Sequence, residues 1–297
     1  MKKLLSLLLL IPGLPLMAQF EDVSITSTHV GGAVHMLEGR GGNLAVMTGP
    51  DGVLMVDDQY APLTDKILAA VREIDDGPVR FVINTHWHFD HTGGNEQLGG
   101  MGAVIVSQDN ARQRMSTDQF MAVIDRNIPA LPPAALPVVT FSDRVTFHFN
   151  GEAVVAYHEA DAHTDGDIII HFPESNVIHM GDIYFNQTYP LIDRDSGGTV
   201  QGMIRAVQSA LGLCHSGTRV IPGHGPLANC ADLESYGQML ADATDRVREL
   251  MEQGMTVEQV IAARPNAAQD ESLGNGFIKP EQFIRFIYSS LAEEAPR

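Results

Sequence analysis

The sequence predicts an α/β fold in which two β-rich layers lie back to back and helices cover their outer faces. One observation is that runs of strands followed by helices occur in both halves of the 297-residue chain. A second is that several apolar strand segments lead directly into histidine or aspartate side chains, where sites on α/β scaffolds are usually built. A third is the hydrophobic content of 44%, which is ample for a large core.

In the first half, residues 30–37 and 44–48 have the composition of two strands, and the glycine-rich residues 39–43 between them predict a flexible hairpin tip. Residues 64–74 carry apolar side chains at helical spacing and end before Gly77 and a proline. The other elements expected here are strands at 53–56, 79–83 and 103–106 and a mixed helical stretch at 108–124.

The second half begins with residues 127–137, whose four prolines predict an irregular connection. A strand pattern then returns, and the chain ends in helices. The expected strands are 138–141, 145–149, 153–157, 168–172, 177–180 and 219–221, and the expected helices are 200–213, 233–253, 257–263 and 280–291.

The N-terminus has the features of a secretory signal. Lys2 and Lys3 precede an apolar run at 4–16, and the small residue Ala18 offers a cleavage point before Gln19. The run is short for a membrane span and contains helix breakers, so a cleaved signal over residues 1–18 is favoured over a stable membrane anchor. The mature chain is expected to be periplasmic or secreted.

The charge balance and the cysteines limit the possible partners and the compartment. A formal net charge of -18 disfavours binding to nucleic acid and anionic lipid. Cys214 and Cys230 are the only cysteines, and in an oxidising compartment they could pair and brace the loop at 222–226. The sequence does not decide whether they do, and it leaves the oligomeric state open.

The segment that carries the chemistry is residues 84–95, which contains three histidines and one aspartate within six positions. Side chains two residues apart in an extended segment point the same way, so His86 and His88 are expected to bind one metal together. Asp90 and His91 follow at a turn signalled by two glycines and can face a second metal. Imidazole and carboxylate are ligands that zinc prefers, so this composition predicts a metal site.

Three further candidate ligands each lie at the end of a predicted strand or in the loop after it: His163, Asp182 and His224. Together with the first segment they give seven groups. Two zinc ions need about three or four protein ligands each plus solvent, and seven groups with one bridging carboxylate match that demand. The sequence therefore predicts two Zn²⁺ per chain.

The order His-x-His-x-Asp-His, then His, Asp and Gly-His-Gly, resembles the metallo-β-lactamase superfamily, from about residue 30 to the C-terminal helices. The resemblance implies a four-layer αββα sandwich in one domain over residues 19–297, with the metals at one edge between the sheets. It also implies the ligand sets: His86, His88 and His163 for the first metal, Asp90, His91 and His224 for the second, and Asp182 as the bridge, as in the glyoxalase II and lactonase branches.

The implied chemistry is a secreted binuclear zinc hydrolase in which a metal-bound hydroxide opens an amide or ester carbonyl. Asp90 would be the catalytic carboxylate that also ligates a metal, orients the hydroxide and relays a proton. The substrates that the resemblance leaves open are a β-lactam, a lactone, an ester and a thioester. Secretion favours the first two over glyoxalase II chemistry, because the thiol cofactor of that reaction is cytoplasmic.

The chain departs from the β-lactamase pattern near Asp182. Many β-lactamases of this superfamily carry cysteine at this position, and this chain has no lysine just after it to bind a β-lactam carboxylate. Tyr184 and Arg194 are the residues expected to bind substrate instead, and simple packing is the alternative for Tyr184.

Three other polar residues are expected to support the ligands. Asp57 ends a strand where this superfamily places a carboxylate that orients a metal-bound imidazole. Thr85 and Thr164 stand next to candidate ligands and can hydrogen-bond them.

Two less favoured functions remain at this point. Phosphodiester hydrolysis is one, and the acidic charge balance counts against it. A metal-binding protein without turnover is the other, and the complete ligand set counts against it because inactive relatives usually lose ligands.

Overall fold

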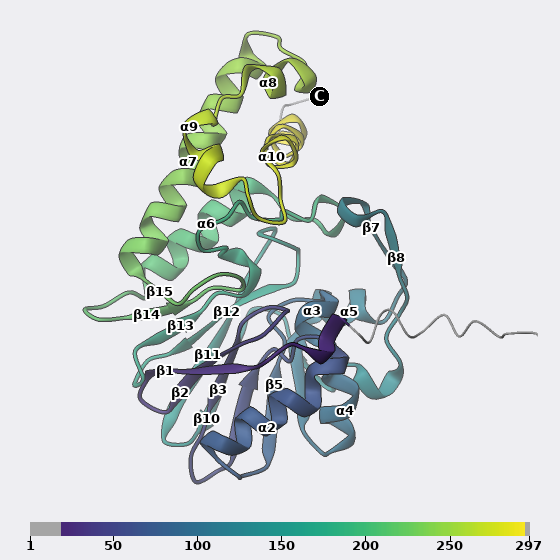
Figure 1. Ribbon diagram of the computed structural model, residues 1–297, viewed down its shortest axis with the longest axis vertical. Coiled ribbons are helices and arrows are strands. Elements are labelled where there is room, and N and C mark those ends of the chain that lie inside the picture. The colour runs from purple at the N-terminus through teal and green to yellow at the C-terminus, as the bar shows by residue number, and fades with distance from the viewer. Residues whose placement is uncertain (1–18, 295–297) are drawn as a thin grey trace, which may run out of the picture.

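The computed structural model describes residues 19–294, so the predicted signal segment at 1–18 lies outside the described residues. The described chain contains two large β-sheets and a set of C-terminal helices that stand at one end of the molecule, beyond the sheets (Figure 1). In this part of the chain no helix is both long and apolar enough to cross a membrane.

The first sheet has seven strands in the spatial order β1-β2-β3-β4-β5-β6-β9. Pairing is antiparallel from β1 to β4 and parallel from β4 to β9. The strands are β1 (Thr26–Gly31), β2 (Val34–Glu38), β3 (Leu44–Met47), β4 (Val53–Val56), β5 (Val79–Ile83), β6 (Val104–Gln108) and β9 (Val139–Phe141).

The second sheet has six strands in sequence order, antiparallel except for the parallel pair β13–β14. The strands are β10 (Arg144–Phe149), β11 (Glu152–Glu159), β12 (Asp167–Phe172), β13 (Val177–His179), β14 (Arg219–Ile221) and β15 (Ala228–Asn229). A separate hairpin joins β7 (Gln119–Met121) to β8 (Arg126–Ile128).

The helices lie outside the two sheets or at their ends. They are α2 (Thr64–Ile74), α3 (Phe89–Thr92), α4 (Asn95–Gly100), α5 (Asp109–Met115), α6 (Val200–Leu211), α7 (Cys230–Glu252), α8 (Val257–Ala263), α9 (Ala267–Leu273) and α10 (Pro280–Glu294). Single 3₁₀ turns are η1 (Ala61–Leu63), η2 (Ala122–Ile124), η3 (Pro133–Ala135), η4 (Gly181–Ile183) and η5 (Arg194–Ser196).

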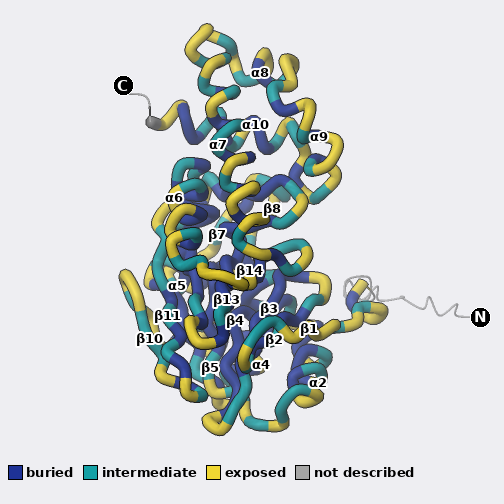
Figure 2. The backbone as a smooth tube through the Cα atoms, turned by 90° about the vertical axis from the view of Figure 1, so that its left-hand side faces the viewer, coloured by how far each residue is buried: buried dark blue, intermediate teal, exposed yellow. Residues whose placement is uncertain are grey.

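Alternation along the strands divides the core into layers. In β3, Ala45 and Met47 face the second sheet, whereas Leu44 and Val46 face α2 on the outside. In β12 the same alternation directs Ile169 toward the cluster that contains α6 and α7. The order helix, sheet, sheet, helix confirms the four-layer αββα sandwich, and the buried backbone lies along its middle (Figure 2).

Three expected elements are wrong, and one helix was not expected. The strand predicted at 30–37 is a hairpin, because Gly32 adopts φ 52° and turns the chain between β1 and β2. The helical stretch at 108–124 ends at Met115 and continues as β7. The connection at 127–137 contains part of β8 and a 3₁₀ turn, and the helix α9 was not expected.

The predicted hairpin tip at 39–43 also differs from expectation. Residues 41–43 are buried rather than at a free tip. The side chain of Asn43 donates to the carbonyl oxygens of Pro222 (2.9 Å) and Gly225 (2.8 Å), which ties this loop to the second sheet. The loop is therefore part of the interface between the two halves of the chain.

Candidate metal centre

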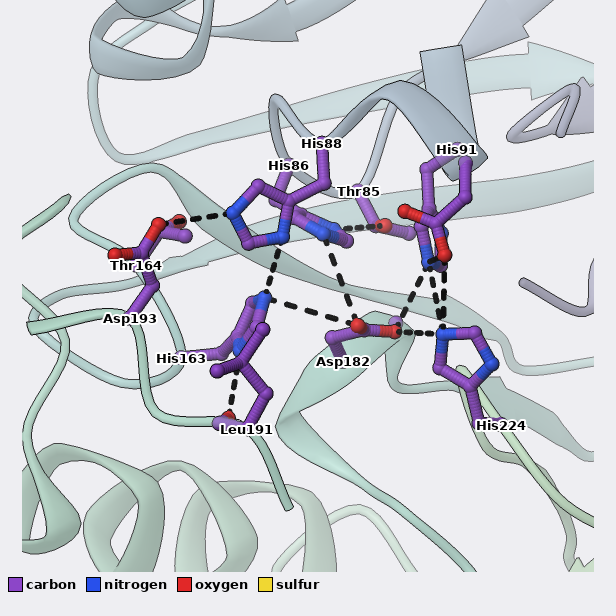
Figure 3. Close-up of polar contacts among 12 residues, drawn as sticks. Thr85, His86, His88, His91, His163, Thr164, Asp182, Leu191, Asp193 and His224 are labelled. Atoms are coloured by element: carbon purple, nitrogen blue, oxygen red, sulfur yellow. Dashed lines mark hydrogen bonds and ion pairs between the residues drawn. The ribbon is translucent and has the colours of Figure 1, made fainter. Parts of the chain in front are cut away.

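The seven predicted ligands converge at one edge of the sandwich, from both sheets. His86, His88, Asp90 and His91 follow β5, whereas His163 follows β11, Asp182 follows β13 and His224 follows β14. Their potential ligand atoms form two groups, each with atoms within 4.8 Å of one another: His86, His88, His163 and Asp182 in one, and Asp90, His91 and His224 in the other. We call these the closed group and the open group. Asp182 lies between them (Figure 3).

Each ring of the closed group has one nitrogen occupied by a partner. His163 Nδ1 donates to the carbonyl oxygen of Leu191 at 2.8 Å, and His88 Nε2 donates to Asp193 Oδ2 at 2.9 Å. The remaining nitrogens, His163 Nε2 and His88 Nδ1, face each other at 2.9 Å. A neutral imidazole carries one N–H, which each ring donates to its partner named above. Each of the two facing nitrogens therefore presents a lone pair, and no hydrogen bond can form between them.

His86 completes this arrangement. Thr85 Oγ1 donates to Asp57 Oδ2 at 2.7 Å, so it accepts from His86 Nδ1 at 3.0 Å. His86 Nε2 is then left buried with no hydrogen-bond partner. Three imidazole lone pairs thus converge without protons between them, which is the donor set that a zinc ion fits.

The charges of the open group also fit a cation. Burial alone lowers the pKa of His91, but the carboxylates of Asp182, Asp90 and Asp57 outweigh it and raise this pKa well above its ordinary value. Burial likewise opposes protonation of His224, yet Asp182 and Asp90 raise its pKa to about 9. The carboxylates therefore favour a positive charge at this position, which a divalent metal would supply.

Burial has the opposite outcome in the closed group. It lowers the pKa of His163 to about 4 and the pKa of His86 well below its ordinary value. These rings are therefore neutral at pH 7 and present lone pairs, as metal ligation requires.

Asp57 supports one ring of each group, in the supporting position predicted for it. Its carboxylate accepts from His91 Nδ1 at 2.8 Å and reaches His86 through the Thr85 hydroxyl. The Thr85 backbone N–H also donates to Asp57 Oδ1 at 2.7 Å. Asp57 is fully buried and has φ 62°, so the turn after β4 is held in a sparsely populated conformation that aims its carboxylate at the site.

Two glycines allow the backbone to approach the ligands. A Cβ on Gly42 would lie 2.0 Å from His91 Cε1, and a Cβ on Gly223 would lie 2.1 Å from Asp182 Oδ1. The loops that carry these glycines therefore close over the centre only because no side chain is present there. Cys214 and Cys230 are joined in a disulfide that brackets the chain segment containing His224.

Some predicted roles do not match the geometry. Thr164 donates to Asp167 rather than to a candidate ligand. The Tyr184 ring is buried against Tyr236 at 4.8 Å and does not line the cavity at the centre. Arg194 pairs with Glu293 and donates to the Gly198 carbonyl, so it does not line this cavity either.

Sequence reasoning missed several residues of the site. The carboxylate of Asp193 was not expected to hold His88, because it lies in an irregular loop without spacing that marks it. The cavity has a volume of about 620 Å³. The missed residues that line it are Arg40, Tyr60, Phe89, Met121, Ile124, Phe185, Thr188, Leu191, Gly276 and Phe277.

A family model described as the metallo-beta-lactamase superfamily matches residues 37–224. The lactamase-like protein aptB of Emericella nidulans is 23% identical over 97% of this chain and 80% of its own length. A hydroxyacylglutathione hydrolase of Rhodospirillum rubrum is 28% identical over 50% of each chain.

Solved structures share the fold at low sequence identity. A metallo-beta-lactamase from Pontibacter korlensis aligns with a TM-score of 0.60 and 19% identity, over 74% of this chain and all of its own. The sec-alkylsulfatase Pisa1 from Pseudomonas sp. aligns with a TM-score of 0.69 and 14% identity, over 92% of this chain and 52% of its own. The chain belongs to the metallo-β-lactamase superfamily and is a metal-dependent hydrolase.

Proposed function

We propose that this protein is an exported hydrolase that uses two zinc ions to open the ester or amide carbonyl of a small molecule. The observation that carries the proposal is the position of Asp182 between the closed and open groups, beside a cavity of about 620 Å³. This volume suits a single small-molecule substrate.

The ligand sets follow from the contacts above. His86, His88 and His163 would hold one zinc, Asp90, His91 and His224 the other, and Asp182 both. Zinc in such a site lowers the pKa of water toward neutrality and polarises a carbonyl oxygen.

Asp90 is the residue of the centre best placed to orient a water molecule at the cavity. Its Oδ2 lies 3.4 Å from His224 Nε2, and its side chain lines the cavity. Burial alone would raise the pKa of Asp90, but His91 and His224 lower it to about 2. Asp90 is therefore ionised at neutral pH and can accept a hydrogen bond from a water molecule and orient it.

The side chains that line the cavity indicate which kind of chemical group the substrate carries next to its carbonyl. Met121 and Ile124 come from the β7–β8 hairpin, Leu191 from the loop after η4, and Phe277 from the segment before α10. Phe185 stacks on the His224 ring with centroids 5.2 Å apart. These side chains would bind an apolar group and keep bulk water from the carbonyl.

Several substrate classes share this reaction. Relatives are named as β-lactamases and as hydroxyacylglutathione hydrolases, and a lactonase or other (thio)esterase activity is the alternative to a β-lactamase. The net charge of -18 disfavours a phosphodiester substrate. Export is supported by the Cys214–Cys230 disulfide, since disulfides persist mainly in oxidising compartments.

The test is turnover by zinc-loaded protein of a chromogenic cephalosporin, an aryl ester and a lactone, with and without a chelator. Asp90→Asn should reduce turnover by about two orders of magnitude or more, because it removes the carboxylate that orients the water molecule. Asp76→Asn changes an exposed aspartate near the opposite end of β5 and is the matched control. Two bound zinc ions without turnover of any of the three compounds would contradict the proposal and favour a metal-binding role.

A further inference from the structure

Arg40 is the only lysine or arginine among the described residues that line the cavity. It lies in the loop between β2 and β3 and is exposed. Within residues 19–294 it forms no ion pair with a carboxylate, whereas Arg194, the residue expected for substrate binding, is paired with Glu293. In a chain with a net charge of -18, an unpaired cation beside the candidate centre requires an explanation.

The loop that carries Arg40 is fixed to the centre. Gly42 N–H donates to the carbonyl oxygen of Asp90 at 3.1 Å, and the Gln59 side-chain amide donates to the Gly42 carbonyl at 2.8 Å. Asn43 ties the same loop to the segment around His224, as described above. The position of the Arg40 backbone relative to the open group is therefore defined before any ligand binds.

The contacts of Arg40 itself leave its charge available. The guanidinium donates to the Gln19 carbonyl at 3.3 Å and to Gln19 Oε1 at 3.5 Å, and it lies 5.6 Å from the centre of the Phe20 ring. These partners are neutral and the hydrogen bonds are long. A guanidinium has five N–H donors, so most of them remain free to bind an anion.

Tyr60 provides a second donor at the same place. Its ring packs between Phe20 at 5.2 Å and Phe89 at 5.9 Å, and it lines the cavity. Burial and the charge of Asp90 raise the pKa of Tyr60 to about 12, against the opposing effect of Arg40. The phenol therefore keeps its proton at neutral pH and can donate a hydrogen bond.

We propose that Arg40 and Tyr60 form an anion subsite that binds a carboxylate of the substrate, while the apolar wall holds the rest of the molecule. The inference rests on the proposed function and narrows it to small esters or amides that carry a carboxylate. Arg is suited to this role because its planar donors match a carboxylate in two parallel hydrogen bonds.

The test compares two substrates that differ only in charge: the mono-4-nitrophenyl ester of an aliphatic dicarboxylic acid and the methyl ester of that compound. Arg40→Ala should raise KM for the charged ester about tenfold, which is the expected loss of a charge-assisted hydrogen bond, and change KM for the neutral ester much less. Arg40→Lys should restore part of the loss, and Tyr60→Phe should give a smaller increase. Equal effects on both esters, or none, would overturn the proposal.

A binding measurement separates this inference from the proposed function. Equilibrium dialysis of the free dicarboxylic acid against zinc-loaded protein should show about tenfold weaker binding to Arg40→Ala than to the wild type. Arg144→Ala removes the same charge from an exposed position on β10 and should bind as the wild type does. If neither ester is hydrolysed but the binding difference is found, the proposed ester or amide substrate fails and the anion subsite stands. Equal binding by Arg40→Ala and wild type overturns the subsite.

Discussion

The closed and open groups share Asp182 but differ in how far solvent reaches them. The side chains of His86, His88 and His163 are 1%, 2% and 0% exposed. In the open group His224 is 29% and Asp90 19% exposed, and His91 is the buried member at 0%. In the closed group every imidazole is held from behind by Thr85, Asp193 or the Leu191 carbonyl. In the open group, the ring of His224 stacks on Phe185 at the cavity.

The difference indicates a division of roles. A buried site whose ligands are fixed by a second set of partners binds metal tightly and exchanges it slowly. A site with exposed ligands can add water or substrate to its coordination shell, as catalytic zinc requires. The closed group thus has the features of an anchoring site, and the open group those of the site that meets the substrate.

The largest effects are expected when one imidazole ring is removed from each group, which tests the division of roles directly. His88→Ala should lower the zinc content of dialysed protein from about two to about one per chain, because the His88 side chain is only 2% exposed and solvent reaches this ligand position less readily than that of His224. His224→Ala should retain nearly two zinc ions and lose turnover, because water can occupy the exposed position. Elemental analysis gives the stoichiometry, with exposed His29→Ala as the control. Equal metal loss in the two variants would contradict the division of roles.

A smaller effect is expected when the supporting carboxylates are changed. Asp193→Asn should weaken zinc binding by about 10–100-fold at the closed group alone, because Asp193 contacts His88. Asp57→Asn should weaken both groups by a similar factor, because Asp57 reaches His86 through Thr85 and His91 directly. Competition with a chromogenic chelator resolves the two affinities. If Asp57→Asn weakens zinc binding only at the open group, the hydrogen bond through Thr85 does not contribute to zinc binding at His86.

The smallest expected effect concerns Glu159, which lies outside both groups and is expected to influence how stability depends on pH. Burial raises the pKa of Glu159, at the end of β11, from its ordinary value of 4.5 to about 7. Ionisation is therefore harder in the folded than in the unfolded chain, so stability falls as pH rises through this window. Glu159→Gln should raise Tm relative to wild type above pH 7 and by less at pH 5. The same Tm difference at both pH values would show that this carboxyl does not govern the pH response.

The ligands and most strands could be predicted from the sequence because both signals are local. His86, His88, Asp90 and His91 lie within one short segment, and an alternating or apolar strand run indicates where each further ligand emerges. The supporting role of Asp57 could be predicted for the same reason, since this residue directly follows β4.

The cavity residues could not be predicted because they become neighbours only through the fold. Met121 and Ile124 have spacing that fits a helix, yet they belong to a hairpin turn that overlies the centre. Arg40 is about 50 residues from Asp90 in the chain, and the contacts of its loop with Asp90, Gln59 and the segment around His224 place it beside the site. Arg194 is closer to Asp182 in the sequence and was therefore the better candidate for substrate binding, but its guanidinium forms an ion pair with Glu293.

The origin of the ligands in both sheets has a thermodynamic consequence. Each group draws ligands from the loop after β5 and from loops of the second sheet, so any metal held there cross-links the two halves of the sandwich. The unfolded chain cannot offer this arrangement, and metal affinity therefore adds directly to folding stability. With zinc bound as proposed, the free energy of unfolding would rise with the free zinc concentration.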